Sequence, residues 1–388
     1  MKQLFRPTPV IISLICCIAI TAFFVPPPIK QQSNTKAVAG AKIQAAILLD
    51  VSGSMNGLIE QAKAQLWTMV STMGRVQCNG VTPQIEIALY EYGRPGNGMA
   101  NGYIKQISGF TSDLDRLSQK LFSLSIEGGD EYCGQVIYAS LKELKWDTTA
   151  TNYKVIFIAG NEDFLQGNTH YTRACTAAKN KGVIVNTIYC GDKMQGIREH
   201  WNLAGECGNG SFTNINQNAT IDDIPTPFDS VLISLNDKLN GTYMPYGSAG
   251  AASISQQREV DKINFAMNKS AGLKRAKVKS SAGLYKNDSW DLVDGYANNL
   301  ASVDKLDRKS LPDSLQAKST EAIKEIITKQ STQRSAVQQQ MANFNAKRDA
   351  YIIAEKAKNV KGKNTETLET VIEKIIREQA KRYNMTVL

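Results

Sequence analysis

Runs of almost uninterrupted apolar residues recur along the first half of the chain. Residues 43–49, 153–159 and 183–189 form three such runs, and residues 84–92 alternate apolar and polar positions with many β-forming types. A strand that is apolar throughout is buried on both faces, as in a parallel sheet with helices on either side. The pattern therefore predicts four strands, three of them fully buried.

Segments with helical spacing separate these strands. In residues 57–73 the apolar positions recur at intervals typical of an amphipathic helix. Further helices are predicted over residues 114–124, 135–144, 172–179 and 196–204, with weaker strands over 103–107 and 211–215. Strands and helices that alternate in this way predict right-handed crossovers and an α/β domain, with a doubly wound, mostly parallel sheet flanked by helices. We assign this domain to residues 41–216.

The composition changes after residue 216. An acidic, proline-containing connector over residues 217–228 leads into residues 229–388, a mainly α-helical C-terminal region rich in Gln, Lys and Ala. Four apolar residues there form a seam with spacings of four, three and seven: Val337, Met341, Phe344 and Tyr351. A break at residues 361–364 precedes a second amphipathic segment. This predicts an antiparallel helical hairpin over about 315–384, or self-association through these helices.

The amino terminus indicates export. Lys2 and Arg6 precede an apolar run over residues 10–25, which is short for a membrane span and long enough for a signal-peptide core. Residues 1–25 are therefore a signal peptide or an uncleaved signal anchor, and residues 26–40 are a linker. We expect a periplasmic or cell-envelope protein, either secreted or attached to the membrane through residues 10–25.

One carboxylate and two hydroxyls directly follow the first buried strand. They belong to Asp50, Ser52 and Ser54, at alternate positions of a tight turn. Ligands bind at the carboxyl ends of the strands in such sheets. Oxygen ligands suit a hard divalent ion such as Mg²⁺, which keeps several waters. The sequence thus predicts an open metal site that can accept one further oxygen.

The pattern Asp50-x-Ser52-x-Ser54 after a hydrophobic strand resembles the first metal-ligand motif of von Willebrand factor type A (VWA) domains, the metal-ion-dependent adhesion site (MIDAS). The resemblance covers roughly residues 41–216, and short stretches of this segment resemble a bacterial subgroup of secreted or membrane-attached proteins. It implies a VWA fold that binds Mg²⁺, or Mn²⁺ or Ca²⁺. It also implies a protein partner whose acidic residue completes the coordination of the ion.

The second motif of the family normally supplies a Thr after two glycines, and Asp130 stands at that position here. Asp130 is either a ligand or a cap of the following helix. As a ligand it would raise the cation affinity or shift the preference toward Ca²⁺, because the number of ligand charges tunes such sites.

The third motif of the family normally supplies an Asp after the central strand, and this position falls on Gly160. The residues available to replace the missing carboxylate are Asn161, Glu162 and Asp163. The sequence does not choose among them, and solvated loop acids are an equally good interpretation of Glu162 and Asp163.

In an exported protein, cysteines form disulfides readily. Five cysteines lie outside the apolar leader, and four of them are candidates for the pairs Cys133–Cys175 and Cys190–Cys207. The alternative is that all five are small buried side chains. The chain has no C-x-x-C pair and only two histidines, and it lacks the H-E-x-x-H and G-x-S-x-G motifs. Zinc binding and hydrolytic catalysis are therefore not expected.

The net charge of +9 is uneven along the chain. From Asp229 onward there are 26 Lys and Arg against 18 Asp and Glu, with a concentration over residues 269–279. A solvated helical face explains this cluster, and attraction to anionic lipids or acidic polymers is the alternative. Nucleic acid is not an expected partner outside the cytoplasm.

These observations predict a non-enzymatic, metal-dependent protein-binding module for adhesion or assembly in the cell envelope. The alternative is a structural envelope scaffold that acts through its C-terminal helices and has a degenerate metal site.

Overall fold

The computed structural model describes residues 40–216, 218, 224–358 and 368–387. The expected leader and nearly all of the linker lie outside the described residues, as does half of the connector. Among the helices that the structure describes, none has the length and apolarity needed to cross a bilayer.

A six-stranded sheet with the order β4-β3-β1-β5-β6-β7 forms the centre of the first domain. Neighbouring strands are parallel except for the pair of β3 with the edge strand β4. The strands are β1 (Lys42–Asp50), β3 (Gln84–Tyr92), β4 (Lys105–Thr111), β5 (Tyr153–Gly160), β6 (Ile184–Cys190) and β7 (Asn209–Ile215). The expected class, a doubly wound and mostly parallel α/β sheet, is confirmed.

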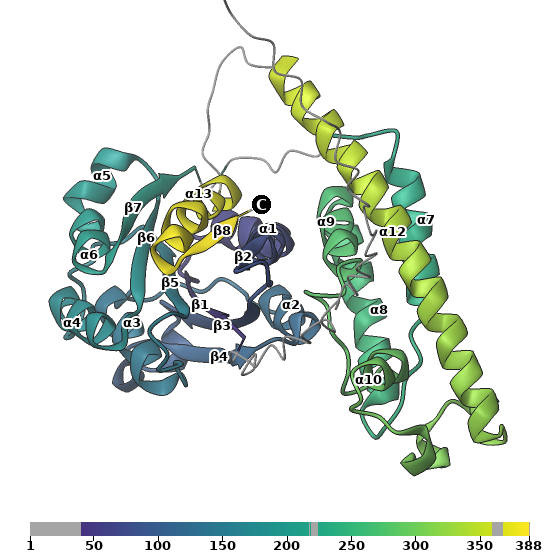
Figure 1. Cartoon of the computed structure of the whole chain (residues 1–388). Coiled ribbons are helices and arrows are strands. Elements are labelled where there is room, and N and C mark those ends of the chain that lie inside the picture. The colour runs from purple at the N-terminus through teal and green to yellow at the C-terminus, as the bar shows by residue number, and fades with distance from the viewer. Residues whose placement is uncertain (1–39, 217, 219–223, 359–367, 388) are drawn as a thin grey trace, which may run out of the picture. The chain divides into compact units, whose positions relative to one another are not determined.

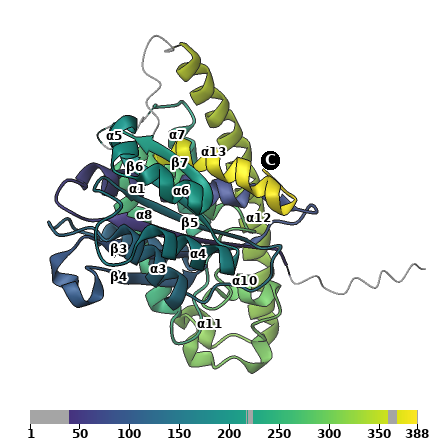
Figure 2. The ribbon, with the colours of Figure 1, turned by 90° about the vertical axis from the view of Figure 1, so that its left-hand side faces the viewer.

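Both faces of this sheet are covered by helices, which explains why its central strands are apolar throughout (Figure 1). Residues Ala45, Ile47 and Leu49 of β1 enter one core, and Ala46 and Leu48 enter the other. The first core is closed by α1 (Asn56–Gly74), α2 (Leu114–Phe122) and α13 (Leu368–Ala380). The second is closed by α3 (Cys133–Glu143), α4 (Tyr171–Lys181) and α6 (Trp201–Cys207), which face the viewer in Figure 2. The short α5 (Lys193–Arg198) precedes α6.

Helix α13 comes from the far end of the sequence and completes the first domain. Its apolar residues, including Leu368, Ile372 and Ile376, are buried in the same core as α1 and β1. At its end, Tyr153 of β5 donates a hydrogen bond of 2.9 Å to Gln379 Oε1. The strand β8 (Met385–Val387) then pairs antiparallel with β2 (Val76–Cys78).

The hairpin expected over residues 315–384 is therefore wrong in the described part of the chain. The apolar stripe of α13 packs against α1 and the sheet, and not along the preceding helix. The α/β domain consequently comprises residues 368–387 in addition to the expected segment, and the helical region lies between its two parts in sequence.

The helical region has two small apolar cores of its own. Its helices are α7 (Asp229–Asn240), α8 (Gly250–Met267), α9 (Lys269–Lys279), α10 (Leu292–Ala297), α11 (Asp313–Gln316) and α12 (Thr320–Lys358). The predicted seam of α12 is buried within the same chain: Val337 and Met341 pack with Leu239, and Tyr351 lies edge-on to Phe228.

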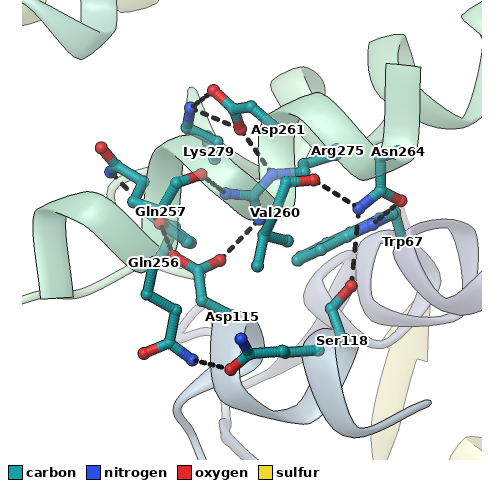
Figure 3. Close-up of polar contacts among 12 residues, drawn as sticks. Trp67, Asp115, Ser118, Gln256, Gln257, Val260, Asp261, Asn264, Arg275 and Lys279 are labelled. Carbon is teal, nitrogen blue, oxygen red and sulfur yellow. Dashed lines mark hydrogen bonds and ion pairs between the residues drawn. The ribbon is translucent and has the colours of Figure 1, made fainter. Parts of the chain in front are cut away.

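A buried network of charged side chains joins α8 and α9 to α1 and α2 (Figure 3). Arg275 is fully buried, and its Nη1 lies 2.6 Å from Asp115 Oδ1 of α2. Its Nε contacts Asp261 of α8, and its guanidinium lies 4.7 Å from the ring centroid of Trp67 of α1. Lys279 adds a second cation, 2.7 Å from Asp261 Oδ2.

This network corrects the interpretation of the basic cluster at residues 269–279. Its side chains do not form a solvated face, because four of them make ion pairs inside the chain. The pairs are Lys274–Glu369, Arg275–Asp115, Lys277–Asp349 and Lys279–Asp261.

Candidate metal-binding site

Asp50 ends β1 at the carboxyl edge of the sheet and is fully buried. Its Oδ1 accepts the Ser52 backbone N–H at 2.8 Å, which fixes the carboxylate over the turn. Its Oδ2 and the buried Ser52 Oγ have no hydrogen-bond partner among the described residues. Buried polar atoms are nearly always satisfied in folded proteins, so this pair is suited to hold something further.

Backbone hydrogen bonds hold the turn in place. The Val51 N–H donates to the Tyr92 carbonyl at the end of β3, at 3.0 Å, and the Glu127 N–H donates to the Val51 carbonyl at 2.9 Å. Met55 is buried and leads directly into α1. The Asp50–Ser54 turn is therefore attached both to β3 and to the loop that precedes α3.

That loop brings Glu131 to the site and not Asp130. Glu131 is only 5% exposed, whereas the neighbouring Asp130 is exposed. The Glu131 N–H donates to Gln166 Oε1 at 3.3 Å, which ties this loop to the loop after β5. Asp130, which the sequence analysis named as the candidate ligand, is thus exposed to solvent.

Gly93 shows how closely three of these side chains converge. It has φ of +84°, and a Cβ there would lie 3.0 Å from Asp50 Oδ1, 3.2 Å from Glu131 Cγ and 3.5 Å from Ser52 Cβ. The three side chains thus surround one small space at the end of β3. Glycine fits this position because it adopts positive φ and leaves the space open.

Burial and nearby charges raise the pKa of both buried carboxyl groups. Burial raises the pKa of Asp50 to about 7, and the charge of Glu162 adds to this. Burial raises the pKa of Glu131 to about 8, and the charges of Asp50 and Glu162 add to it. Such groups are stabilised as carboxylates when a cation binds between them.

Gly160 lies at the end of β5, where the third motif of VWA domains normally has its Asp. This position has no room for a side chain. A Cβ at Gly160 would lie 2.9 Å from Asp50 Oδ2 and would collide with the Tyr92 hydroxyl. The next residue, Asn161, turns to the rim instead, where its Nδ2 donates to Ser54 Oγ at 3.1 Å.

The two acids that follow are placed differently. Glu162 is exposed, and its Oε2 accepts a long hydrogen bond of 3.5 Å from Gln166. Asp163 turns away from the site, because its Oδ1 lies 3.0 Å from His200 Nδ1 and accepts the Leu165 N–H at 2.9 Å. Asp50 and Ser52 thus form the buried floor, Ser54 and Asn161 form the rim, and Glu162 lies outside it.

The structure corrects the expected disulfide pairing. Cys175 of α4 is bonded to Cys207 of α6, two helices that pack on the same face of the sheet. Cys133 and Cys190 are free and buried near the ends of their elements. The pairs Cys133–Cys175 and Cys190–Cys207 are therefore wrong. Burial raises the pKa of the Cys133 and Cys190 thiols, so these two are not reactive thiolates at neutral pH.

Among the described residues, no cluster of three or more His, Cys, Asp or Glu side chains is arranged to hold a metal ion. A cation at Asp50 would therefore have at most two carboxylate ligands from the described residues, with hydroxyl, amide and water oxygens as its other ligands. The unpartnered Asp50 Oδ2 and Ser52 Oγ fit such an ion, because hard cations take mixed oxygen ligands of this kind.

Sequence reasoning missed Glu131. Asp130 and Glu131 are adjacent and both precede a helix, so the pattern alone does not say which side chain turns inward. The available signal was the Tyr-Cys sequence that follows Glu131, because Cys133 is buried at the first turn of α3 and brings the loop against the sheet.

Comparisons with known proteins do not assign this chain to a family. No family model matches it, and no curated protein matches it. Among solved structures it is similar to proximal thread matrix protein 1 from the mussel byssus, with 14% identity and a TM-score of 0.34, over 45% of this chain and 42% of that protein. It is also similar to the VWA domain of SpRpn10, with 16% identity and a TM-score of 0.34, over 48% of this chain and 90% of that domain. A third is an aerotolerance-related membrane protein from Bacteroides fragilis, with 16% identity and a TM-score of 0.33, over 45% of this chain and 93% of that one. At these values the likenesses establish neither a family nor a function.

Proposed function

We propose that this chain is a protein-binding module that depends on a divalent cation held at the carboxyl edge of its sheet. The observation that carries the proposal is the pair of buried, unpartnered oxygens, Asp50 Oδ2 and Ser52 Oγ, next to the buried Glu131 carboxyl group. An isolated buried carboxylate is costly, and a bound cation offsets that cost.

In this proposal each residue has a defined part. Asp50 and Ser52 hold the ion from the floor, and Ser54 with Asn161 limits access from the rim. The ion is Mg²⁺, or else Mn²⁺ or Ca²⁺. The oxygens of the chain coordinate it incompletely, and a carboxylate of a protein partner completes its coordination shell. The role is adhesion or assembly in the cell envelope, without catalysis.

The loop after β3 supports a recognition role for this edge. Arg94 Nε lies 2.9 Å from Glu91 Oε1, and its Nη1 lies 3.0 Å from Glu127 Oε2, so the loop is fastened beside the site. Met99 on the same loop is 69% exposed. A fixed loop with an exposed apolar side chain next to a metal site is suited to contact a partner protein.

Calorimetric titration of the full chain with Mg²⁺, Mn²⁺ and Ca²⁺ tests the proposal. We expect one site per chain, and we expect Asp50→Asn to weaken cation binding by about tenfold or more, since even outer-shell changes cost that much. Asp237→Asn, on an exposed position of α7, is the matched control and should bind like the parent. Absence of heat with all three ions, at a folded site, would refute the proposal.

A second candidate function is the structural scaffold that acts through its C-terminal helices with a degenerate metal site. The observation that favours it is the crowded Gly160, which leaves the third-motif position without a carboxylate. The same titration separates the two, because the scaffold requires no cation at Asp50.

A further inference from the structure

Two adjacent acids, Asp130 and Glu131, lie at the opening of the loop that precedes α3, and only one of them faces the site. We propose that Glu131, and not Asp130, is the second carboxylate ligand of the cation bound at Asp50. This inference rests on the proposed function, and it assigns the ligand that sequence reasoning placed on the neighbouring residue.

Burial separates the two acids first. Glu131 is 5% exposed, and none of the ion pairs of the described residues includes it or Asp50. Two carboxylates buried side by side without a cationic side chain repel each other and lose hydration. Asp130 keeps its hydration and its charge is screened by water, because it is exposed to solvent.

The backbone explains how Glu131 reaches inward. Gly129 lies against the loop after β3: a Cβ there would be 2.5 Å from the Gly93 carbonyl oxygen and 2.7 Å from Pro95 Cδ. This close approach brings the next residues over the Gly93 position, where the Glu131 side chain meets Asp50 and Ser52. The Gln166 side chain then holds the Glu131 backbone from the other side.

Asp130 lies toward the rim. It lies close enough to Tyr103 that its charge, after desolvation, raises the pKa of that phenol. Tyr103 in turn packs edge-on against Tyr132, with ring centroids 5.3 Å apart. Asp130 is therefore placed to meet an approaching partner, and Glu131 is placed to meet the ion.

When both are ionised, as cation binding favours, Asp50 and Glu131 carry two negative charges, which match the charge of a divalent ion. The chain therefore retains its cation without a partner, and a partner only completes the shell. This makes the inference testable on the chain alone, with Mn²⁺ as the probe.

The experiment measures Mn²⁺ affinity by calorimetry and by electron paramagnetic resonance in the full chain and in the isosteric pair Glu131→Gln and Asp130→Asn. We expect Glu131→Gln to weaken Mn²⁺ binding about tenfold or more, and Asp130→Asn to change it less than about twofold, since an exposed charge is screened by solvent. The increase in Tm that Mn²⁺ causes should likewise be lost in Glu131→Gln and kept in Asp130→Asn.

The outcomes separate this inference from the proposed function. If the parent binds Mn²⁺ and Asp50→Asn abolishes binding, but Asp130→Asn weakens it more than Glu131→Gln does, only the ligand assignment is overturned. If the parent binds no Mn²⁺, both are overturned. The Tm of each variant without metal shows whether it is folded, and Glu131→Gln should be about as stable as the parent because the amide has nearly the size of the carboxyl group and carries no charge.

Discussion

At the scale of single residues, the site depends on two positions that have no side chain. Gly93 and Gly160 each leave room for the Asp50 carboxylate, from opposite sides. The Asp50-x-Ser52-x-Ser54 turn could be predicted from the sequence because its residues are close together in the chain and follow a buried strand. Glu131 could not, because the direction of a loop side chain is decided by packing between distant segments.

Gly160→Ala should therefore disturb the site even though alanine is small. Its Cβ would press on Asp50 Oδ2 and on the Tyr92 hydroxyl, and we expect a loss of about 1–3 kcal/mol in the free energy of unfolding, together with weaker Mn²⁺ binding. Urea unfolding and calorimetry measure the two effects. Gly53→Ala is the matched control, because a Cβ there meets nothing within 4 Å. Equal stability of the two variants would contradict the crowding argument.

At the scale of elements, most helices and strands of the first domain could be predicted, since each has a local apolar pattern. The strand predicted over residues 84–92 has the bounds of β3, and residues 57–73 lie within α1. The apolar pattern of an amphipathic helix does not show which element the helix packs against. The stripe of α13 would fit an adjacent helix or a distant sheet equally well, and the structure shows that it packs on the sheet.

Ile372→Ala tests that placement. Ile372 is buried in the core shared with α1 and β1, and truncating such a residue leaves a cavity that costs about 2–5 kcal/mol. We expect this loss in urea unfolding, with faster hydrogen exchange in β1 and β5. Lys374→Ala, on the exposed side of the same helix, should be close to neutral. Faster exchange confined to α12 would instead support the hairpin.

At the scale of the whole molecule, a network of buried charges joins the described parts of the helical region to α1 and α2. Such pairs are costly to form and costly to break, because removing one partner leaves an uncompensated charge. The sequence showed the basic residues of α9 but not their acidic partners, which lie on α2, α8, α12 and α13. Arg275 and Asp115 are 160 positions apart in the sequence. A pairing over such a separation cannot be inferred from local composition.

The network predicts how stability depends on pH. Burial alone would raise the pKa of Asp261, but the charges of Lys279 and Arg275 outweigh it and hold that pKa below its ordinary value of 3.8. Asp261 is therefore ionised in the folded state where it would be protonated in the unfolded state. Its contribution to stability is present above about pH 4 and is lost as the pH falls below that value.

The variant Asp261→Asn should lose about 3–5 kcal/mol at neutral pH, since Arg275 and Lys279 are left without this partner. Its unfolding free energy should also fall less steeply than that of the parent between pH 5 and pH 3. Urea unfolding across this range measures both effects, with Asp237→Asn as the control. A parallel decline in parent and variant would show that Asp261 does not carry the acid sensitivity.

The return of the chain to its first domain bears on biosynthesis. Strand β1 and helix α1 leave the ribosome early, but the helix that covers their apolar side begins at Leu368. Helices α1 and α2 are already available to pack on this side of the sheet, but the part that α13 covers stays exposed while the entire helical region is translated. Because uncovered apolar surface promotes aggregation, we expect the nascent chain to be most prone to aggregate before α13 has emerged.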